Sequence, residues 1–169
     1  AGAQKNMGAA GVTLVVIKES ILNKVTRDVP SMLNYKLYIN AGSMSNTPPV
    51  FAIYTTLLNL RWIQSQGGLE ELDKRNKNKA KLLYDEVDRN SCFSGFAAKE
   101  DRSYMNVTFT LINDNLSTDF NNAWEENYII GLKGHRSVGG YRASIYNALP
   151  IESIELLIKC MQQFEEKFK

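Results

Sequence analysis

The sequence is short of the residues that build metal sites and disulfide frameworks. Its 169 residues include two cysteines, Cys92 and Cys160, and a single histidine. The cysteines lie far apart in the chain, so neither a disulfide framework nor a zinc cluster has enough ligands. We therefore expect no metal, and a reducing, cytoplasmic setting is the default expectation.

An excess of charge of one sign and long apolar runs are also missing. The formal net charge is only +2, which is not the electrostatic footprint of a nucleic-acid binder or of a polybasic membrane anchor. No window approaches the roughly 18 apolar residues of a membrane span, and the amino terminus lacks the regions of a signal peptide. The sequence predicts a soluble protein with no nucleic acid and no membrane as partner. Because it begins without methionine, we also expect a fragment or a processed piece.

The first part of the chain contains few elements. Gly11 to Ile17 is a β-branched apolar run without alternation, which predicts a strand buried on both faces of a large sheet. The polar stretch from Asn34 to Ser45 is typical of a long connection with at most short pieces of structure. From Val50 to Gln64 the apolar residues follow helical spacing, and two glycines then end the run.

The rest of the chain alternates helices and strands. A helix is predicted over Leu69 to Arg89, and a half-buried strand over Met105 to Leu111, where apolar and polar residues alternate. Leu116 to Asn127 reads as a helix, and Tyr141 to Tyr146 alternates again. Ile151 to Phe168 forms a final amphipathic helix that opens after a proline.

This order predicts an α/β fold in two parts. Residues 69–169 form a small α/β domain, whose antiparallel sheet is covered by helices on one side. Residues 1–68 hold one convincing strand, which cannot satisfy its backbone or bury both faces by itself. We therefore expect residues 1–68 to be the remnant of a larger domain.

The first eleven residues contain one bulky charged side chain, Lys5, among alanines and glycines. Small neighbours leave room for a large guest close to the backbone. A desolvated lysine loses its proton more readily and can attack a carbonyl, which is the Schiff-base chemistry used with pyridoxal phosphate. The alternative is an ordinary surface lysine in a glycine-rich loop.

The segment Asn46-Thr47-Pro48-Pro49 precedes the first long helix. Thr47 suits a helix N-cap and Pro48 suits the first helical position, so we expect the helix to start here. A helix start binds anions through free donors, and the prolines leave the Thr47 hydroxyl and N–H and the Asn46 amide for this role. The alternative is a capped helix without a ligand.

Two further groups of polar residues lie near the carboxyl terminus. His135 and Arg136 stand together in a glycine-rich loop, and such a pair can clamp a phosphate or a carboxylate. In the following strand, the period of two places Arg142, Ser144 and Tyr146 on one face. Arg142 either pairs with a structural carboxylate or holds a substrate carboxylate by two parallel hydrogen bonds.

Over its whole length the sequence resembles the phosphoserine aminotransferases, class V members of the fold type I pyridoxal phosphate enzymes. The stretches that carry the resemblance are Gly2 to Asn6, Asn46 to Pro49, Arg102 to Asn106 and, most specifically, Gly134 to Ala148. The resemblance covers only the second half of a family member. The acidic partner of the pyridine nitrogen, the aromatic that stacks on the ring and most of the large-domain sheet belong to the other half, so this piece is expected to be inactive alone.

The resemblance implies a homodimer that transfers an amino group from glutamate to 3-phosphohydroxypyruvate in serine biosynthesis, with pyridoxal 5′-phosphate as cofactor. Lys5 would hold the cofactor covalently and then carry a proton between the substrate and the cofactor. Gln4 would lie beside the cofactor. Asn46 and Thr47 would bind the cofactor phosphate of the neighbouring subunit.

The resemblance also assigns the substrate contacts. Arg142 would bind the α-carboxylate, while His135 and Arg136 would receive the distal phosphate or the side-chain carboxylate of glutamate. An alternative within the class is a transaminase that acts on serine or alanine with glyoxylate, although the His135-Arg136 pair favours an anionic distal group. An alternative of another kind is a non-catalytic association domain.

Overall fold

A computed structural model describes all residues, 1–169, and divides them into two compact units, Ala1–Ser65 and Gln66–Lys169. The division lies slightly before the boundary at residue 68 that the sequence suggests. Gly67 is the N-cap of the helix that begins the second unit, and it has a positive φ of 96°. The glycines therefore belong to the start of that helix, because a left-handed cap suits a residue without Cβ.

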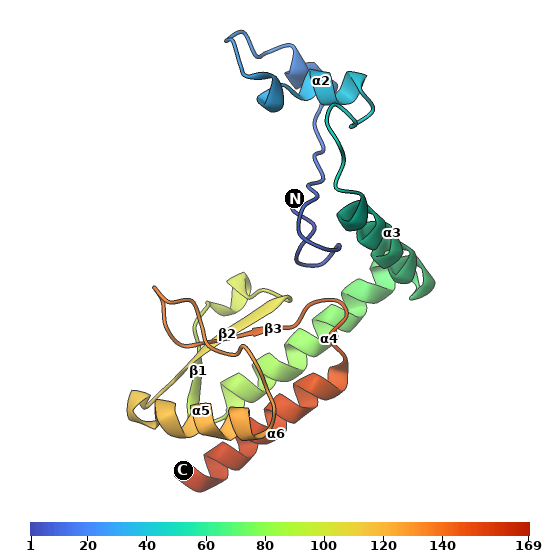
Figure 1. Ribbon diagram of the computed structural model, residues 1–169. Coiled ribbons are helices and arrows are strands. Elements are labelled where there is room, and N and C mark those ends of the chain that lie inside the picture. Colours follow the sequence, from blue (N-terminus) through green and yellow to red (C-terminus); the bar gives the residue numbers. More distant parts are fainter. The chain divides into compact units, whose positions relative to one another are not determined.

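The second unit contains a three-stranded antiparallel sheet in the order β1-β2-β3 (Figure 1). Its strands are β1 (Phe93–Gly95), β2 (Asn106–Leu111) and β3 (Tyr141–Ser144). In β2 every second residue is buried, which confirms the expected half-buried antiparallel strand. β1 was not predicted, because three residues are too short to show a period.

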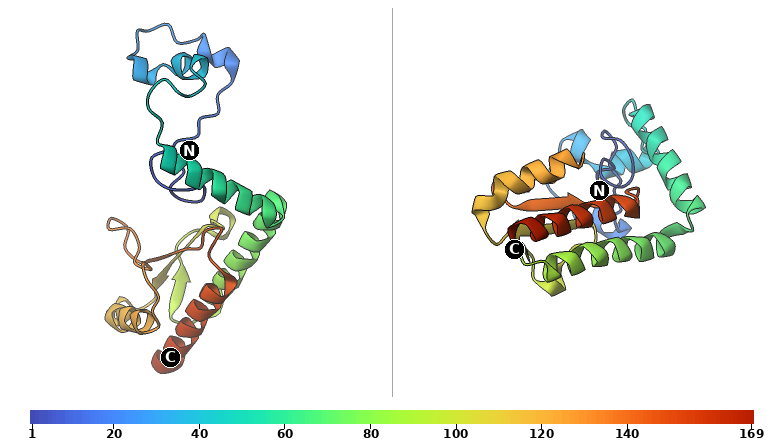
Figure 2. Two further views of the ribbon diagram at one scale, coloured as in Figure 1. Left: turned by 45° about the vertical axis from the view of Figure 1, so that its right-hand side comes forward. Right: turned by 90° about the horizontal axis from the view of Figure 1, so that it is seen from below.

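Three helices cover one face of this sheet: α4 (Gly68–Arg89), α5 (Ser117–Glu126) and α6 (Ile151–Phe168). In the right-hand view of Figure 2, α6 lies between α4 and α5, and it packs against both. All three helices were expected within a residue of these bounds, and the α/β fold class is confirmed. Short 3₁₀ turns at Lys99–Asp101 and Asp114–Leu116 complete the unit.

The core between the sheet and the helices is largely aromatic. Phe120 of α5 is fully buried, and its ring meets those of Phe93, Tyr141 and Phe164 edge-on at centroid distances of 4.8 to 5.0 Å. Phe109 of β2 joins the same cluster. Edge-to-face pairs add to the burial of apolar area, so strands and helices of this unit are held in one arrangement.

The first unit is mostly irregular apart from its last helix. It contains α1 (Glu19–Leu22), a 3₁₀ turn at Ser31–Leu33, α2 (Tyr35–Asn40) and α3 (Val50–Ser65). The long connection with short pieces of structure and the apolar helix are both confirmed. None of the helices of either unit combines the length and the hydropathy of a membrane-spanning segment.

The buried strand expected at Gly11 to Ile17 is wrong for this chain. Only Thr13 makes a bridge, to Gly2, and Val16 is 90% exposed. The apolar, β-branched composition of the segment suits a strand, but a strand forms only where neighbouring strands supply backbone partners. The first unit has no other strand that could do so.

Candidate functional site

Lys5 lies in a closed turn near the amino terminus. The Ala3 N–H donates to the Val12 carbonyl at 3.0 Å, and the Ala3 carbonyl accepts from the N–H groups of Met7 and Gly8 at 3.0 and 2.8 Å. Ala3 is buried, whereas the Lys5 side chain is exposed. No hydrogen bond or ion pair within the chain engages the Lys5 ammonium group. The turn therefore presents a free amine on a fixed backbone.

Polar residues on α3 hold this turn in place. The Asn59 side-chain amide donates to the Asn6 carbonyl at 2.8 Å, and the Thr55 hydroxyl accepts from the Ala9 N–H at 3.4 Å. A Cβ on Gly8 would lie 2.4 Å from Thr56 Oγ1 and 2.9 Å from Thr56 Cα. Gly8 is therefore required for close approach to the helix, and not only for room around Lys5. The sequence signal for these anchors is the group of three polar residues, Thr55, Thr56 and Asn59, within the apolar run from Val50 to Leu60.

The start of α3 differs from the expectation. The helix begins at Val50, and the Pro49 carbonyl accepts the Ile53 N–H at 3.0 Å, so Pro49 is the N-cap. The predicted cap at Thr47 is wrong because Pro48 precedes another proline, which disfavours the helical backbone that the first helical position needs. Thr47 and Asn46 are exposed, and Asn46 donates to the Thr47 carbonyl at 3.2 Å.

The turn that carries Lys5 and the start of α3 meet within the first unit. A Cβ placed on Gly11 would lie 3.5 Å from the Ala52 Cβ and 3.9 Å from the Pro49 Cβ. Gly11 also has a φ of 116°, which side chains rarely adopt. The Lys5 turn and the Asn46-Thr47 segment are thus both attached to the first turns of one helix.

In the second unit, a tight loop carries His135 and Arg136. The loop closes through bonds from the Gly134 N–H to the Gly140 carbonyl at 2.8 Å and from the Arg142 N–H to the Leu132 carbonyl at 2.7 Å. A Cβ on Gly134 would lie 2.1 Å from the Gly139 carbonyl oxygen. The glycine content of this segment is therefore a steric requirement of the loop.

Ser137 fixes the state of the histidine ring. His135 Nδ1 lies 2.7 Å from Ser137 Oγ and 3.3 Å from the Ser137 backbone nitrogen. Because a backbone N–H can only donate, Nδ1 is the acceptor, and the proton of the neutral ring sits on Nε2. Nε2 is then a donor for an anion. Sequence reasoning missed Ser137, whose only signal was its place two residues after a histidine in a loop.

His135 and Arg142 line one hollow of about 180 Å³ together with Thr108, Phe96 and Val138. Arg142 faces Thr108 in the register of β3 on β2 and is exposed, as the alternating pattern predicted. It forms no ion pair with a carboxylate of this chain. Arg136, also exposed, is not among the residues that line the hollow.

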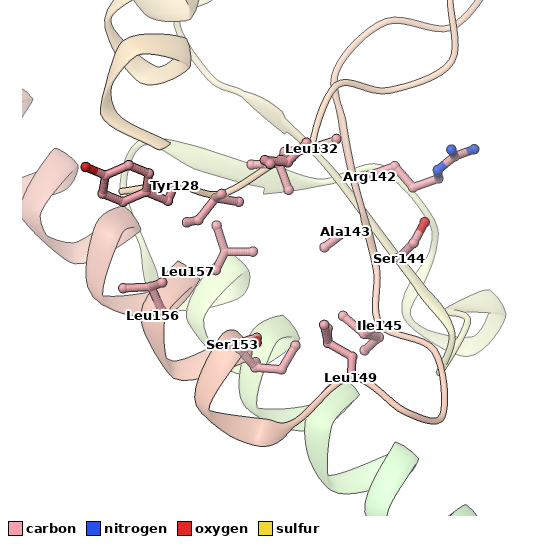
Figure 3. Close-up of a pocket in the computed structure, with 14 residues that line it drawn as sticks. Tyr128, Leu132, Arg142, Ala143, Ser144, Ile145, Leu149, Ser153, Leu156 and Leu157 are labelled. Carbon is pink, nitrogen blue, oxygen red and sulfur yellow. The ribbon is translucent and has the colours of Figure 1, made fainter. Parts of the chain in front are cut away.

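A second cavity, of about 280 Å³, lies on the other side of Arg142 and is mainly apolar. Figure 3 shows Leu132, Ala143 and Leu157 around it, while the Arg142 guanidinium points away from them. The charged end of Arg142 is therefore left to the polar face of the sheet.

The six other residues predicted for the site fall into two groups by unit. Gln4, Lys5, Asn46 and Thr47 belong to the first unit, and the cations His135 and Arg136 belong with Arg142 to the second. The chemistry available is a free amine on one unit and exposed anion-binding side chains on both.

Comparison with known proteins gives the family. The sequence profile of aminotransferase class-V matches residues 1–157. The chain belongs to the class-V aminotransferases. Such a match covers nearly all of the elements described above, from the Lys5 turn to the first half of α6.

Individual class-V aminotransferases are similar over the whole chain. The phosphoserine aminotransferase of Flavobacterium psychrophilum is 56% identical over 99% of this chain. A solved phosphoserine aminotransferase, studied for radiation damage of its Schiff base, is 48% identical over 98% of the chain with a TM-score of 0.93. A pyridoxal phosphate-bound phosphoserine aminotransferase from Trichomonas vaginalis is 38% identical over 95% of the chain, with a TM-score of 0.89. The chain spans about half the length of these proteins, 47% of the first and 46% of the other two.

Proposed function

We propose that the complete protein is a phosphoserine aminotransferase, which transfers the amino group of glutamate to 3-phosphohydroxypyruvate and so serves serine biosynthesis. The observation that carries the proposal is the free Lys5 amine on an anchored turn, in a chain that is 56% identical to a protein of that name. Residues 1–68 then belong to the large cofactor-binding domain and residues 69–169 to the small domain. We place the enzyme in the cytoplasm.

The residues of the first unit fit pyridoxal 5′-phosphate. A Schiff base requires a lysine amine that is accessible and not engaged by a carboxylate, and Lys5 meets both conditions. The cofactor phosphate requires donors, which the Thr47 hydroxyl and N–H and the Asn46 amide supply at an exposed helix start. Gln4, next to Lys5, adds an exposed amide that can reach a polar edge of the cofactor.

When bound, the cofactor supplies an electron sink for negative charge that develops at the substrate Cα. Lys5 Nζ would hold the cofactor, and as a free amine it would hold and return the proton of the substrate Cα. The bonds from the Asn59 amide to the Asn6 carbonyl and from the Gly8 N–H to the Ala3 carbonyl hold the turn on either side of Lys5. In the complete protein, these bonds would leave motion mainly to the lysine side chain.

The cations of the second unit bind the two ends of the substrate. Arg142 forms paired hydrogen bonds with the α-carboxylate, which every amino-acid substrate has. His135, through Nε2, and Arg136 receive the distal group, which is a phosphate in one half-reaction and a carboxylate in the other. A site that binds through charge, and not through a neutral pocket shaped to one group, can accept both anions.

We also propose that the complete protein is a homodimer whose active site is shared between subunits. In support, most residues of α3 are apolar, but the helix buries only Ala52 and Ile63. Its exposed large side chains are Val50, Phe51, Ile53, Tyr54, Leu57, Leu58 and Leu60. A helix of this composition is normally buried, so α3 is expected to pack against further protein.

The test is chemical labelling of the full-length protein. Borohydride reduction in the presence of pyridoxal phosphate, followed by peptide mapping, should place the cofactor on Lys5. Lys5→Ala should abolish transamination and leave the fold intact, because the side chain is exposed and makes no contact that the fold needs. Attachment at any other lysine would refute the assignment. If the protein shows no near-visible absorbance band that shifts when glutamate is added, the alternative of a non-catalytic association domain is favoured instead.

A further inference from the structure

Lys79 differs from the other lysines of α4. Lys74, Lys77 and Lys81 lie on the exposed face of the helix, each close to an acidic side chain three or four residues away. Lys79 is only 4% exposed, and no acidic side chain pairs with it. Burying an ammonium group without a counter-charge is costly, and such a group is rare unless it makes specific hydrogen bonds.

The bonds of Lys79 all go to one segment of backbone. Its Nζ donates to the carbonyls of Ile145, Tyr146 and Leu149 at 3.2, 2.8 and 3.1 Å, which uses all three of its donors. These carbonyls lie between the end of β3 and the start of α6, outside helix and strand, and the Tyr146 carbonyl also accepts from the Leu149 N–H at 3.0 Å. Burial lowers the pKa of the ammonium group, because it disfavours the charged form. The three hydrogen bonds therefore form although burial of the charge costs free energy.

A second polar residue of α4 holds the same segment. Asn76, one turn before Lys79 on the same face, is 3% exposed and donates from Nδ2 to Asn147 Oδ1 at 2.8 Å. Two buried side chains of one helix thus fix residues 145–149. Apolar packing of α4 does not explain why Asn76 and Lys79 are buried, because Leu or Ala would be buried at these positions at a lower cost in free energy.

We propose that Lys79 is a positioning residue for the substrate-carboxylate site, acting through the end of β3 on Arg142. This rests on the proposed role of Arg142. Ile145 follows β3 directly, and its N–H donates to the Met105 carbonyl at 2.9 Å, which continues the register that sets Arg142 opposite Thr108. A strand shifted by one residue presents the opposite face. Anchoring the carbonyls of Ile145 and Tyr146 therefore keeps the guanidinium on the polar face of the sheet.

The experiment compares variants of the full-length holoenzyme. Lys79→Met keeps the length of the side chain but removes its donors, and Lys81→Met is the matched control on the exposed face of the same helix. We expect Lys79→Met to raise KM for glutamate and Kd for glutarate, an unreactive dicarboxylate, at least tenfold. The change in kcat should be smaller. Amide exchange at Arg142 and Ile145 should accelerate at least tenfold, and Lys81→Met should leave every value within twofold.

Two outcomes would overturn the proposal. One is a lowered melting temperature of Lys79→Met with KM, Kd and the Arg142 amide exchange unchanged, which would make Lys79 purely structural. If Lys79→Met does not fold, Asn76→Ala decides, because it removes one tie and leaves Lys79 in place. It should raise Kd for glutarate about threefold, and no change would refute the proposal. Glutarate binding and amide exchange do not require turnover, so they test the role of Lys79 without an activity measurement. A wild-type protein that lacks transaminase activity would refute the proposed function, which is a separate outcome.

Discussion

At the scale of single residues, the proposed site depends on side chains that the fold leaves free. Lys5 and Arg142 are exposed and have no partner in the chain, whereas His135 is oriented by Ser137. Other cationic side chains of the chain do pair with a carboxylate, as Lys77 does with Asp73 at 2.6 Å. Cations without a partner are available for a ligand, and their location decides which part of the ligand each one binds.

Arg142 and Arg136 should differ in which substrates they affect. Loss of a charge-assisted contact to a desolvated anion costs about 2 kcal/mol, roughly thirtyfold in kcat/KM. Arg142→Ala should lower kcat/KM for every amino-acid substrate, because all have the α-carboxylate. Arg136→Ala should act mainly on phosphoserine and glutamate and spare alanine. Steady-state kinetics of the full-length enzyme measure this, and equal losses on all substrates would contradict the division of roles.

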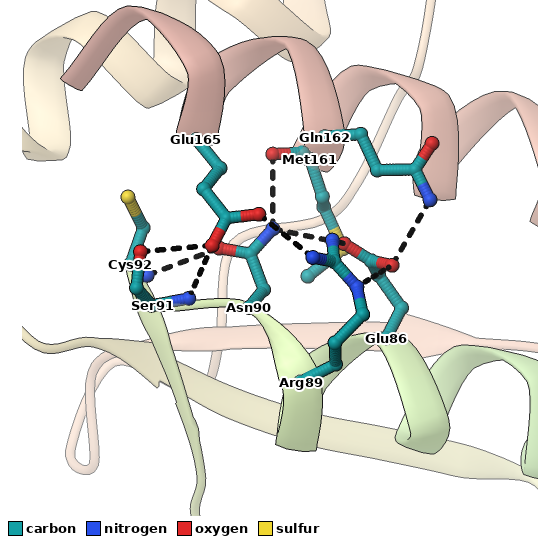
Figure 4. A network of polar contacts seen from close by, with 8 residues as sticks. All are labelled: Glu86, Arg89, Asn90, Ser91, Cys92, Met161, Gln162 and Glu165. Carbon is teal, nitrogen blue, oxygen red and sulfur yellow. Dashed lines mark hydrogen bonds and ion pairs between the residues drawn. The ribbon is translucent and has the colours of Figure 1, made fainter. Parts of the chain in front are cut away.

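At the scale of elements, α6 is joined to the rest of the second unit by polar contacts as well as by its apolar stripe. Glu165 of α6 accepts from the Ser91 N–H and hydroxyl at 2.7 and 2.8 Å and from Arg89 at 3.0 Å (Figure 4). Arg89 also binds Glu86 of its own helix at 2.6 Å. These bonds connect the end of α6 to the end of α4, although the two helix ends are far apart in the sequence.

This network makes a pH-dependent contribution to stability. The Ser91 N–H and hydroxyl, followed by Arg89, lower the pKa of Glu165 from its ordinary 4.5 to about 2. A carboxyl whose pKa is lower in the folded state stabilises the fold above its unfolded pKa, and this is lost as pH falls through the folded value. The contribution of Glu165 should therefore be complete above pH 4.5 and disappear towards pH 2.

Urea unfolding of wild type and Glu165→Gln between pH 7 and 2 measures this contribution. The difference in unfolding free energy should be constant at the upper end and shrink steadily below pH 4.5, the ordinary pKa. Glu166→Gln is the control, because the Glu166 carboxyl is exposed and does not belong to this network. A difference between wild type and Glu165→Gln that does not change with pH would exclude ionisation of Glu165 as its source.

At the scale of the whole molecule, the two units differ in how much they bury. The second unit has an aromatic core between a sheet and three helices, whereas the first leaves Leu14, Val15 and Val16 exposed along with most of α3. Apolar surface of this extent is unfavourable in water. We therefore expect the first unit to become better ordered when further protein covers this surface.

Hydrogen exchange on the 169-residue chain should show this difference. We expect slow exchange in Asn106–Leu111 and Ile151–Phe168 and fast exchange around Lys5, because protection follows buried hydrogen-bonded structure. The chain alone should bind pyridoxal phosphate without specificity. Adding the other half of the protein should slow exchange around Lys5 and produce cofactor absorbance together. Stoichiometric binding at Lys5 by this chain alone would show that the site needs no further residues.

The sequence by itself determined the four longer helices, α3 to α6, two of the three strands and the family, because these depend on local periodicity and on motifs of adjacent residues. It also determined that Arg142 shares a polar face with Ser144, since alternation along a strand is local. The roles of Lys5, Asn46, Thr47, His135, Arg136 and Arg142 remain predictions from resemblance.

Only the tertiary structure decided what depends on partners distant in the chain. In the structure, Gly8 contacts α3, and that helix begins at Val50. The apolar run from Leu14 to Val16 is exposed. Lys79 is the clearest case, since its sequence context is that of an exposed helical lysine. Its burial follows from the carbonyls that the end of β3 brings to α4, and no local pattern in the sequence encodes that meeting.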